Sequence, residues 1–260
     1  RMVIDGLTSD LSRVMYDRAL TDFFSWYQDT GKRGLSKAVV SEYKVYLQGL
    51  KYAPSSINQK LSAIKRLAIE ASDNGLIDGQ IATGITRVKG VKSSGVRSGN
   101  WLSKDQAQKL IDATDITTLK GLRDRAILAI MLGAGLRRSE VSNLTFDHIQ
   151  QREGRWVIVD LVSKGNRVRT VPIPSWSKQA IDEWSQTAGI TSGRIFRAIN
   201  RGGNLAGDSI TSQAIQDVVK TYAGKCGIQL SAHDLRRTFA KLARKGGADM
   251  MQIQLTLGHA

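Results

Sequence analysis

A change in the spacing of apolar residues along the chain limits the possible folds more than any other feature. Over residues 8–86 apolar side chains recur every three or four positions, the period of a helix with one buried face. Over residues 155–173 the period becomes two and β-branched residues dominate, as in strands. A helical region followed by a mixed one predicts a mainly α protein with a small antiparallel β-sheet, in the α+β class.

The helical region predicts one domain of four helices over residues 1–86. The first helix covers residues 8–28, and Ser36 is the expected N-cap of the second. Pro54 precedes the third helix, and Asp78 begins a short fourth. Four helices with apolar faces can enclose a core of their own.

Residues 87–100, with the sequence RVKGVKSSGVRSGN, contain no acidic residue and follow the helical region. Their glycines, serines and charges are typical of a flexible linker between domains. Two interpretations remain open: a solvated tether, or a basic strap that lies along phosphates and becomes ordered on binding. The candidate phosphate-binding residues of this segment are Arg87, Lys89, Lys92 and Arg97.

Residues 101–260 are predicted to form one mixed domain around a strongly apolar helix at residues 119–132. A β-hairpin joins strands 155–162 and 167–173 through the turn Ser-Lys-Gly-Asn. Further helices are expected over residues 103–110, 137–144, 175–188, 209–222, 232–245 and 249–257.

The chain carries 38 lysines and arginines against 23 acidic residues, a net charge of +15. Such an excess favours a polyanionic partner, most often nucleic acid. An anionic membrane surface is the competing partner, but no helix pairs a basic face with a face rich in Trp and Leu. No apolar run reaches the ~20 residues that cross a bilayer, so we expect no membrane partner.

Cysteine and histidine usage fits a reducing compartment and gives no sign of a metal site. The single cysteine, Cys226, cannot form an internal disulfide, which favours the cytoplasm. His148, His233 and His259 have no cysteine partners at the spacing of zinc ligands.

Arg137 follows a glycine-rich turn, at the start of a predicted helix where backbone amides favour an anion. An arginine there can bind phosphate oxygens with two nitrogens, and Glu140 could hold it in place from three residues on. On local evidence alone, an exposed ion pair of little consequence is the better interpretation of these two residues.

Four other groups could act on a phosphate. Lys164, at the hairpin tip, could donate a proton to a departing oxygen, although a turn lysine is usually only solvated. His233 and Arg236, three residues apart on one helix, offer a titratable group and a fixed cation to one phosphate. His259 follows Gly258 at a helix end, where a histidine is ordinarily a surface residue.

The order of these motifs is more specific than any one of them. GLRRSE, then SKGN followed by VPIP, then HDLRRTFA, then LGHA resemble the tyrosine recombinase (phage integrase) family, which includes the Xer-like site-specific recombinases. The resemblance covers nearly the whole chain. It implies that residues 1–86 are a helical core-binding (SAM-like) domain, residues 87–100 an interdomain linker, and residues 101–260 the catalytic domain.

The resemblance also implies roles for the residues that match its motifs. Arg137 would be the first catalytic arginine and Glu140 its supporting acid. Lys164 would be the general acid for the leaving 5′ oxygen. His233 and Arg236 would be the histidine and the second arginine of the HxxR pair, with His233 moving a proton to and from the nucleophile.

His259 would be the final histidine of the family, with a hydrogen bond to the scissile phosphate. Arg237 stands where many members carry histidine, at a position that is not catalytic in the family. The family's nucleophile is a tyrosine shortly after LGH, and none of the six tyrosines in residues 1–260 has that place. We therefore assign no nucleophile within these residues and expect the chain as given to bind DNA without cleaving it.

The reaction implied is phosphoryl transfer through a 3′-phosphotyrosyl intermediate, in DNA integration or recombination, without a metal or cofactor. The implied partner is double-stranded DNA with a specific recombination site. The implied assembly is a tetramer on synapsed DNA and a monomer or weak oligomer without it, in the cytoplasm at the nucleoid. Two alternatives remain open: a tyrosine-less DNA-binding homologue that acts as a regulator or excision helper, and a type IB topoisomerase-like enzyme that relaxes DNA.

Overall fold

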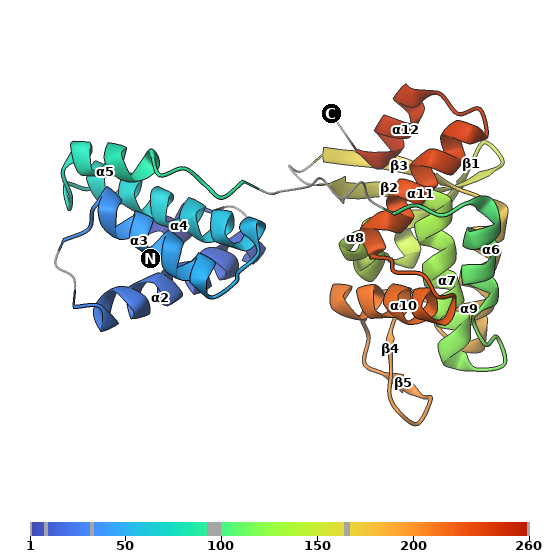
Figure 1. Ribbon diagram of the computed structural model, residues 1–260. Coiled ribbons are helices and arrows are strands. Elements are labelled where there is room, and N and C mark those ends of the chain that lie inside the picture. The colour runs from blue at the N-terminus through green and yellow to red at the C-terminus, as the bar shows by residue number, and fades with distance from the viewer. Residues whose placement is uncertain (1, 8–9, 32–33, 93–99, 164–166, 259–260) are drawn as a thin grey trace. The chain divides into compact units, whose positions relative to one another are not determined.

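The computed structural model describes residues 2–7, 10–31, 34–92, 100–163 and 167–258 (Figure 1). The chain divides into two compact units, Arg1–Arg97 and Ser98–Ala260. Three of the sequence-predicted site residues, Arg97, Lys164 and His259, lie outside the described residues.

The first unit is helical, and its four predicted helices are confirmed. The Ser36 hydroxyl accepts a hydrogen bond from the Val39 amide at 3.4 Å, and the Asp78 carboxylate accepts one from Gln80 at 2.6 Å. A short additional helix precedes the predicted four. The helices are α1 (Met2–Asp5), α2 (Asp10–Asp29), α3 (Lys37–Gly49), α4 (Pro54–Asp73) and α5 (Gly79–Thr86).

The core of the first unit is apolar and aromatic. Phe23 of α2 is fully buried and meets Tyr43 of α3 edge-on, with the ring centroids 5.1 Å apart. Ile57 and Ile64 of α4 are buried in the same cluster. This contact of three helices gives the unit a core of its own.

The chain after α5 stays attached to the first unit. Val88 is buried in its core, and the Asn58 side chain both donates to the Val91 carbonyl (3.0 Å) and accepts from the Val91 amide (2.8 Å). A Cβ at Gly90 would lie 2.5 Å from the Asn58 oxygen, so the backbone approaches closely there. The expected linker therefore differs from a free tether over residues 87–91. Its described basic side chains are exposed: Arg87, Lys89 and Lys92.

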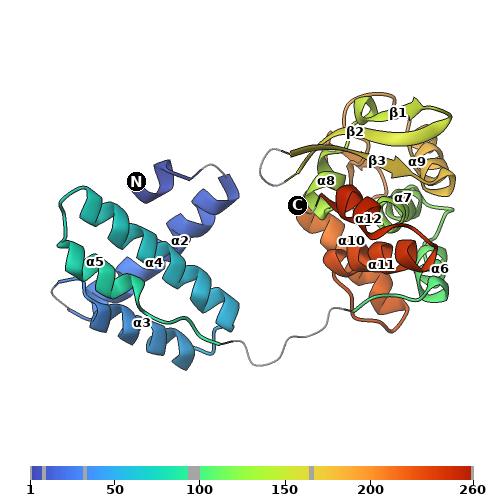
Figure 2. The same cartoon turned by 90° about the horizontal axis from the view of Figure 1, so that it is seen from above.

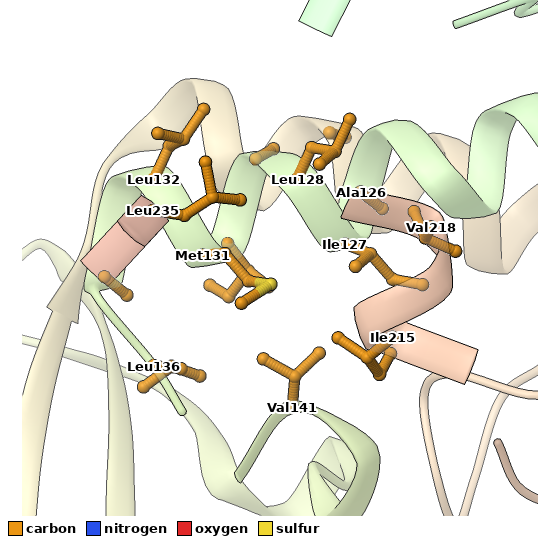
Figure 3. Packing of buried hydrophobic residues seen from close by; sticks show 14 of the residues in the cluster. Ala126, Ile127, Leu128, Met131, Leu132, Leu136, Val141, Ile215, Val218 and Leu235 are labelled. Carbon is orange, nitrogen blue, oxygen red and sulfur yellow. The ribbon is translucent and has the colours of Figure 1, made fainter. Parts of the chain in front are cut away.

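The second unit is built around the buried helix α7 (Leu119–Ala134). Its residues from Ala126 to Leu132 are apolar on all sides, which requires neighbours on every face. Figure 3 shows Met131 and Ile127 of this helix beside Val141, Ile215 and Leu235, which come from three other segments. The helices in contact with α7 are α6 (Lys104–Asp112), α8 (Arg138–Asn143), α9 (Ser175–Thr187), α10 (Ser212–Lys225) and α11 (Ala232–Lys245).

A three-stranded antiparallel sheet in the order β1-β2-β3 packs beside these helices (Figure 2). The predicted hairpin is confirmed as β2 (Arg155–Ser163) and β3 (Arg167–Ile173), with Ile158 opposite Val171. The strand β1 (Ile149–Arg152) and the two-residue strands β4 (Ala198–Ile199) and β5 (Leu205–Ala206) were not predicted.

A glycine in the left-handed backbone conformation ends α7 and directs the chain into α8. The helix α7 ends at Ala134, and Gly135 follows with φ of 62°. A Cβ at Gly135 would lie 2.5 Å from the Phe239 ring, so both the backbone conformation and the space require glycine. The last helix, α12 (Met250–Leu257), ends at Gly258 in the same way, with φ of 63°. None of the described helices is long and apolar enough to cross a membrane.

Candidate active site

A pocket of about 420 Å³ lies where the first turns of α8 and α11 meet α10. It brings Arg137 together with two predicted site residues that follow it by about 100 positions in the sequence, His233 and Arg236. No carboxylate is among the described lining residues, so the pocket is suited to an anion. The lining residues are Arg137, Arg138, Ser139, Gln216, Ser231, Ala232, His233 and Arg236.

Arg137 is held by Glu140 at two points. Its backbone amide donates to Glu140 Oε2 at 2.8 Å, and its Nη1 donates to Glu140 Oε1 at 2.8 Å. The Glu140 side chain is only 6% exposed, whereas that of Arg137 is 31% exposed. The carboxylate is thus part of the interior, and the guanidinium reaches from it toward the pocket. This burial distinguishes the pair from a mobile ion pair on the surface.

Arg236 is buried and connects the ends of two helices. Its Nη1 donates to the Gly135 carbonyl at 2.7 Å, and its Nη2 donates to the Leu257 carbonyl. Burial lowers the pKa of Arg236 to about 10, with the positive charge of Arg137 as the next cause. The guanidinium therefore remains a cation at neutral pH.

His233 lies in the first turn of α11, at the pocket wall. The start of the helix is fixed because Asp234 accepts hydrogen bonds from the Ser231 amide (2.9 Å) and hydroxyl (2.7 Å). Partial burial lowers the pKa of His233, followed by the positive charges of Arg237 and Arg236, while Asp234 opposes the shift. A neutral imidazole at pH 7 can accept a proton.

Two predicted site residues, Lys164 and His259, lie outside the described residues. The strands β2 and β3 are described up to Ser163 and from Arg167, on either side of Lys164. Gly258 is the last described residue before His259, and the Leu257 carbonyl is bonded to Arg236 of the pocket. The predicted roles of Lys164 and His259 stay predictions.

Comparison with known proteins identifies the family. The model of the phage integrase family matches residues 100–260. The tyrosine recombinase XerC of Pseudomonas putida (strain F1) is 32% identical over 212 residues, which cover 80% of this chain and 67% of the relative. The XerC of Myxococcus xanthus is 30% identical over 252 residues, covering 93% and 80%. The chain belongs to the tyrosine recombinase (phage integrase) family.

Solved structures of tyrosine recombinases share the fold. XerH bound to its difH substrate superimposes with a TM-score of 0.73 at 18% identity, covering 96% of this chain and 74% of that one. A lambda integrase dimer bound to a COC′ core site gives a TM-score of 0.71 at 16% identity, covering 97% and 69%. The predicted fold class is thereby confirmed.

The family fixes the class of reaction. Tyrosine recombinases cleave and rejoin DNA strands, as the sequence predicted, and the comparisons do not favour the regulator or topoisomerase alternatives. The chain spans about two thirds of the length of the Pseudomonas XerC relatives.

One arginine beside the recombinase pocket was missed in the sequence. Arg169 of β3 donates to Glu140 Oε1 (3.1 Å) and Oε2 (2.9 Å), and its side chain is 9% exposed. The alternation of side chains along the strand could have indicated that Arg169 is buried, because it lies on the same face as the buried Val171 and Ile173. An arginine at an inward position of a strand is rare unless it has a partner.

Proposed function

We propose that the chain is the DNA-binding and catalytic core of a site-specific recombinase or integrase that acts through a 3′-phosphotyrosyl intermediate. The observation that carries the proposal is the single pocket lined by Arg137, His233 and Arg236, in a chain of this family. The guanidinium groups of Arg137 and Arg236 can bind a phosphodiester, and the neutral imidazole of His233 can move one proton.

The two arginines would stabilise the charge that develops on the scissile phosphate. A phosphodiester gains negative charge on its non-bridging oxygens as the nucleophile attacks, and fixed donors stabilise this charge without rearrangement. The many hydrogen bonds that hold Arg137 and Arg236 make them such fixed donors. In this proposal they take the place of the metal ions of other phosphoryl-transfer enzymes, and no metal or cofactor is required.

The proton inventory of the reaction balances. The tyrosine hydroxyl loses its proton as its oxygen bonds to phosphorus, and His233 accepts that proton. The bond to the 5′ oxygen breaks, and Lys164 donates a proton to this leaving group, while His259 donates a hydrogen bond to the phosphate. A 5′ hydroxyl then reverses these steps on the 3′-phosphotyrosyl ester, so the bond energy is conserved.

The nucleophile is proposed to be a tyrosine that follows His259 closely in the natural protein. Five of the six tyrosines belong to the first unit, and none of the six is among the residues that line the pocket. Tyr222 is buried in the core of the second unit, where its hydroxyl donates to Asp124 at 3.2 Å.

The proposed partner is double-stranded DNA with a specific recombination site. One solved neighbour is a lambda integrase tetramer bound to a Holliday junction, which supports a tetramer on synapsed DNA for this chain as well. Residues 1–86 would be the core-binding domain, and the linker would add phosphate contacts through its exposed basic residues. We also propose that the protein acts in the cytoplasm, at the nucleoid.

Trapping the covalent intermediate tests the proposal. The product of the natural gene, with any residues that follow position 260, is incubated with a nicked duplex. The duplex carries a site selected from random sequence by binding. An adduct that survives SDS, and that is lost when the proposed tyrosine is changed to Phe, is the expected result. Binding without an adduct would favour the regulator, and relaxation of supercoiled DNA without the site would favour the topoisomerase.

A further inference from the structure

A buried arginine outside the pocket contacts two parts of the candidate site. Arg169 is not among the pocket-lining residues, yet its two Nη atoms donate to the two oxygens of Glu140. Its Nε donates to the Thr256 carbonyl in the last turn of α12, at 2.8 Å. One guanidinium on a strand thus joins α8 to α12.

The Glu140 carboxylate is fixed from two sides. Oε1 accepts from Nη1 of Arg137 and Nη1 of Arg169, and Oε2 accepts from the Arg137 amide and Nη2 of Arg169. With both oxygens bonded to both arginines, the carboxylate cannot rotate without breaking bonds on each side. The position of the Arg137 guanidinium therefore depends on Arg169, because the shared carboxylate joins the two arginines.

The same guanidinium holds the end of α12. Arg169 binds the Thr256 carbonyl and Arg236 binds the next carbonyl, that of Leu257. Carbonyls in the last turn of a helix have no partner within the helix, so these bonds set where the helix ends. The chain continues from there through Gly258 to His259.

We propose that Arg169 is a positioning residue for strand cleavage. It orients Arg137 through Glu140, and it holds the end of α12 from which the chain leads to His259. The inference rests on the proposed function, because it assigns to Arg169 a part in the same reaction. Arg169 acts through other residues and does not touch the DNA.

A second buried arginine in the same unit provides a matched control. Arg123 of α7 is 7% exposed and donates twice to the fully buried Asp124, at 2.9 and 2.7 Å. It also donates to the Arg197 carbonyl at 3.3 Å. Arg123 thus has the burial, the carboxylate and the backbone carbonyl that Arg169 has, but neither it nor Asp124 lines the pocket.

The test compares Arg169→Met, Arg169→Lys and Arg123→Met in the natural full-length protein. The measurements are Tm, Kd for the cognate duplex, and the single-turnover rate of cleavage at saturating DNA. Both Met variants should lower Tm, because each leaves a buried carboxylate short of donors. Only Arg169→Met should slow cleavage at saturating DNA, by about 10- to 100-fold. Arg169→Lys should cleave faster than Arg169→Met but more slowly than the wild type. Lysine keeps the positive charge but lacks the two parallel N–H donors that bind both oxygens of Glu140.

Coupling to Glu140 separates positioning from a general loss of stability. In a double-mutant cycle, Arg169→Met and Glu140→Gln should together slow cleavage no more than the more severe single change. The reason is that Arg169 orients Arg137 only through the Glu140 carboxylate. Additive losses would overturn the proposal. Equal loss of rate in Arg169→Met and Arg123→Met would also overturn it.

Crystal structures of the two Met variants give a result that does not depend on cleavage. The Arg137 guanidinium and the last turn of α12 should shift in Arg169→Met and stay in place in Arg123→Met. Unshifted positions in Arg169→Met would overturn the inference even if the wild-type protein formed no adduct. A wild-type protein without an adduct, with the expected shifts in Arg169→Met, would count against the proposed function alone. If Arg169→Met does not fold, the same comparison is made with Arg169→Lys.

Discussion

In the first unit, the basic side chains after α5 are exposed, although Val88 between them is buried. In the second unit, the arginines at the pocket are bonded to a buried carboxylate and to backbone carbonyls at helix ends. Exposed cations contribute to DNA affinity through counterion release, roughly in proportion to their number. Buried cations are held in a single position by their hydrogen-bond partners, so the loss of one of them alters the positions of the others. The two units are therefore expected to respond to mutation in different ways, with loss of affinity in one and loss of rate in the other.

The largest effect is expected at the pocket arginines. Arg137→Ala or Arg236→Ala should slow single-turnover cleavage by about 10³-fold or more, because each removes a fixed cation from the transition state. The exposed neighbour Arg237, which pairs with Asp234 at 3.0 Å, provides the control as Arg237→Ala. A similar loss of rate in all three variants would remove the distinction between pocket and surface.

Lys164 should affect the rate nearly as strongly, with binding almost intact. Lys164→Ala removes the proposed proton donor, a loss of about 10²- to 10⁴-fold for general acid catalysis. A DNA substrate with a 5′-thio leaving group needs no proton donor and should restore the rate of the variant. Equal losses of rate and affinity, without rescue by the thio substrate, would contradict the general-acid role.

Protonation of His233 should determine the pH below which the cleavage rate declines. Because burial lowers its pKa from the usual value of 6.5, the imidazole takes up a proton at a lower pH than an exposed histidine does. Cleavage should therefore decline as the pH falls through that lowered pKa. His233→Gln should be about 10²-fold slower and should lack this acidic limb. A midpoint above pH 6.5 in the wild-type protein would contradict the assignment.

The smallest effect is expected in the basic segment of the first unit. Changing Arg87, Lys89, Lys92 and Arg97 together to Gln should reduce the slope of log Kd against log salt by up to about 0.9 for each DNA phosphate that these side chains neutralise. The cleavage rate at saturating DNA should not change. An unchanged slope would show that the segment only connects the two units.

The sequence predicted the features whose signals are local or ordered. The helices of both units follow from apolar periods and caps such as Ser36 and Asp78, and the family follows from the order of its motifs. The strand β1 was missed because its residues, IQQR, are mostly polar. Its pairing depends on the following turn, where Glu153 and Gly154 have φ of 49° and 74°.

The remaining errors arise where burial is decided by distant parts of the chain. Residues 87–91 were interpreted by their charge, but Val88 and the contact of Val91 with Asn58 attach them to the first unit. Arg169 resembled one more basic residue of a hairpin, because its partners Glu140 and Thr256 are 29 and 87 positions away. No local pattern contains such pairings.

A crystal structure of the natural protein on nicked cognate DNA, with vanadate in place of the scissile phosphate, tests the central claim most directly. Vanadate adopts the five-coordinate geometry of the transition state. The account predicts that Arg137 and Arg236 donate hydrogen bonds to the vanadate oxygens and that His233 lies beside the attacking tyrosine oxygen. Glu140 should still be bonded to both Arg137 and Arg169. Vanadate and the DNA backbone bound away from this pocket would contradict the account.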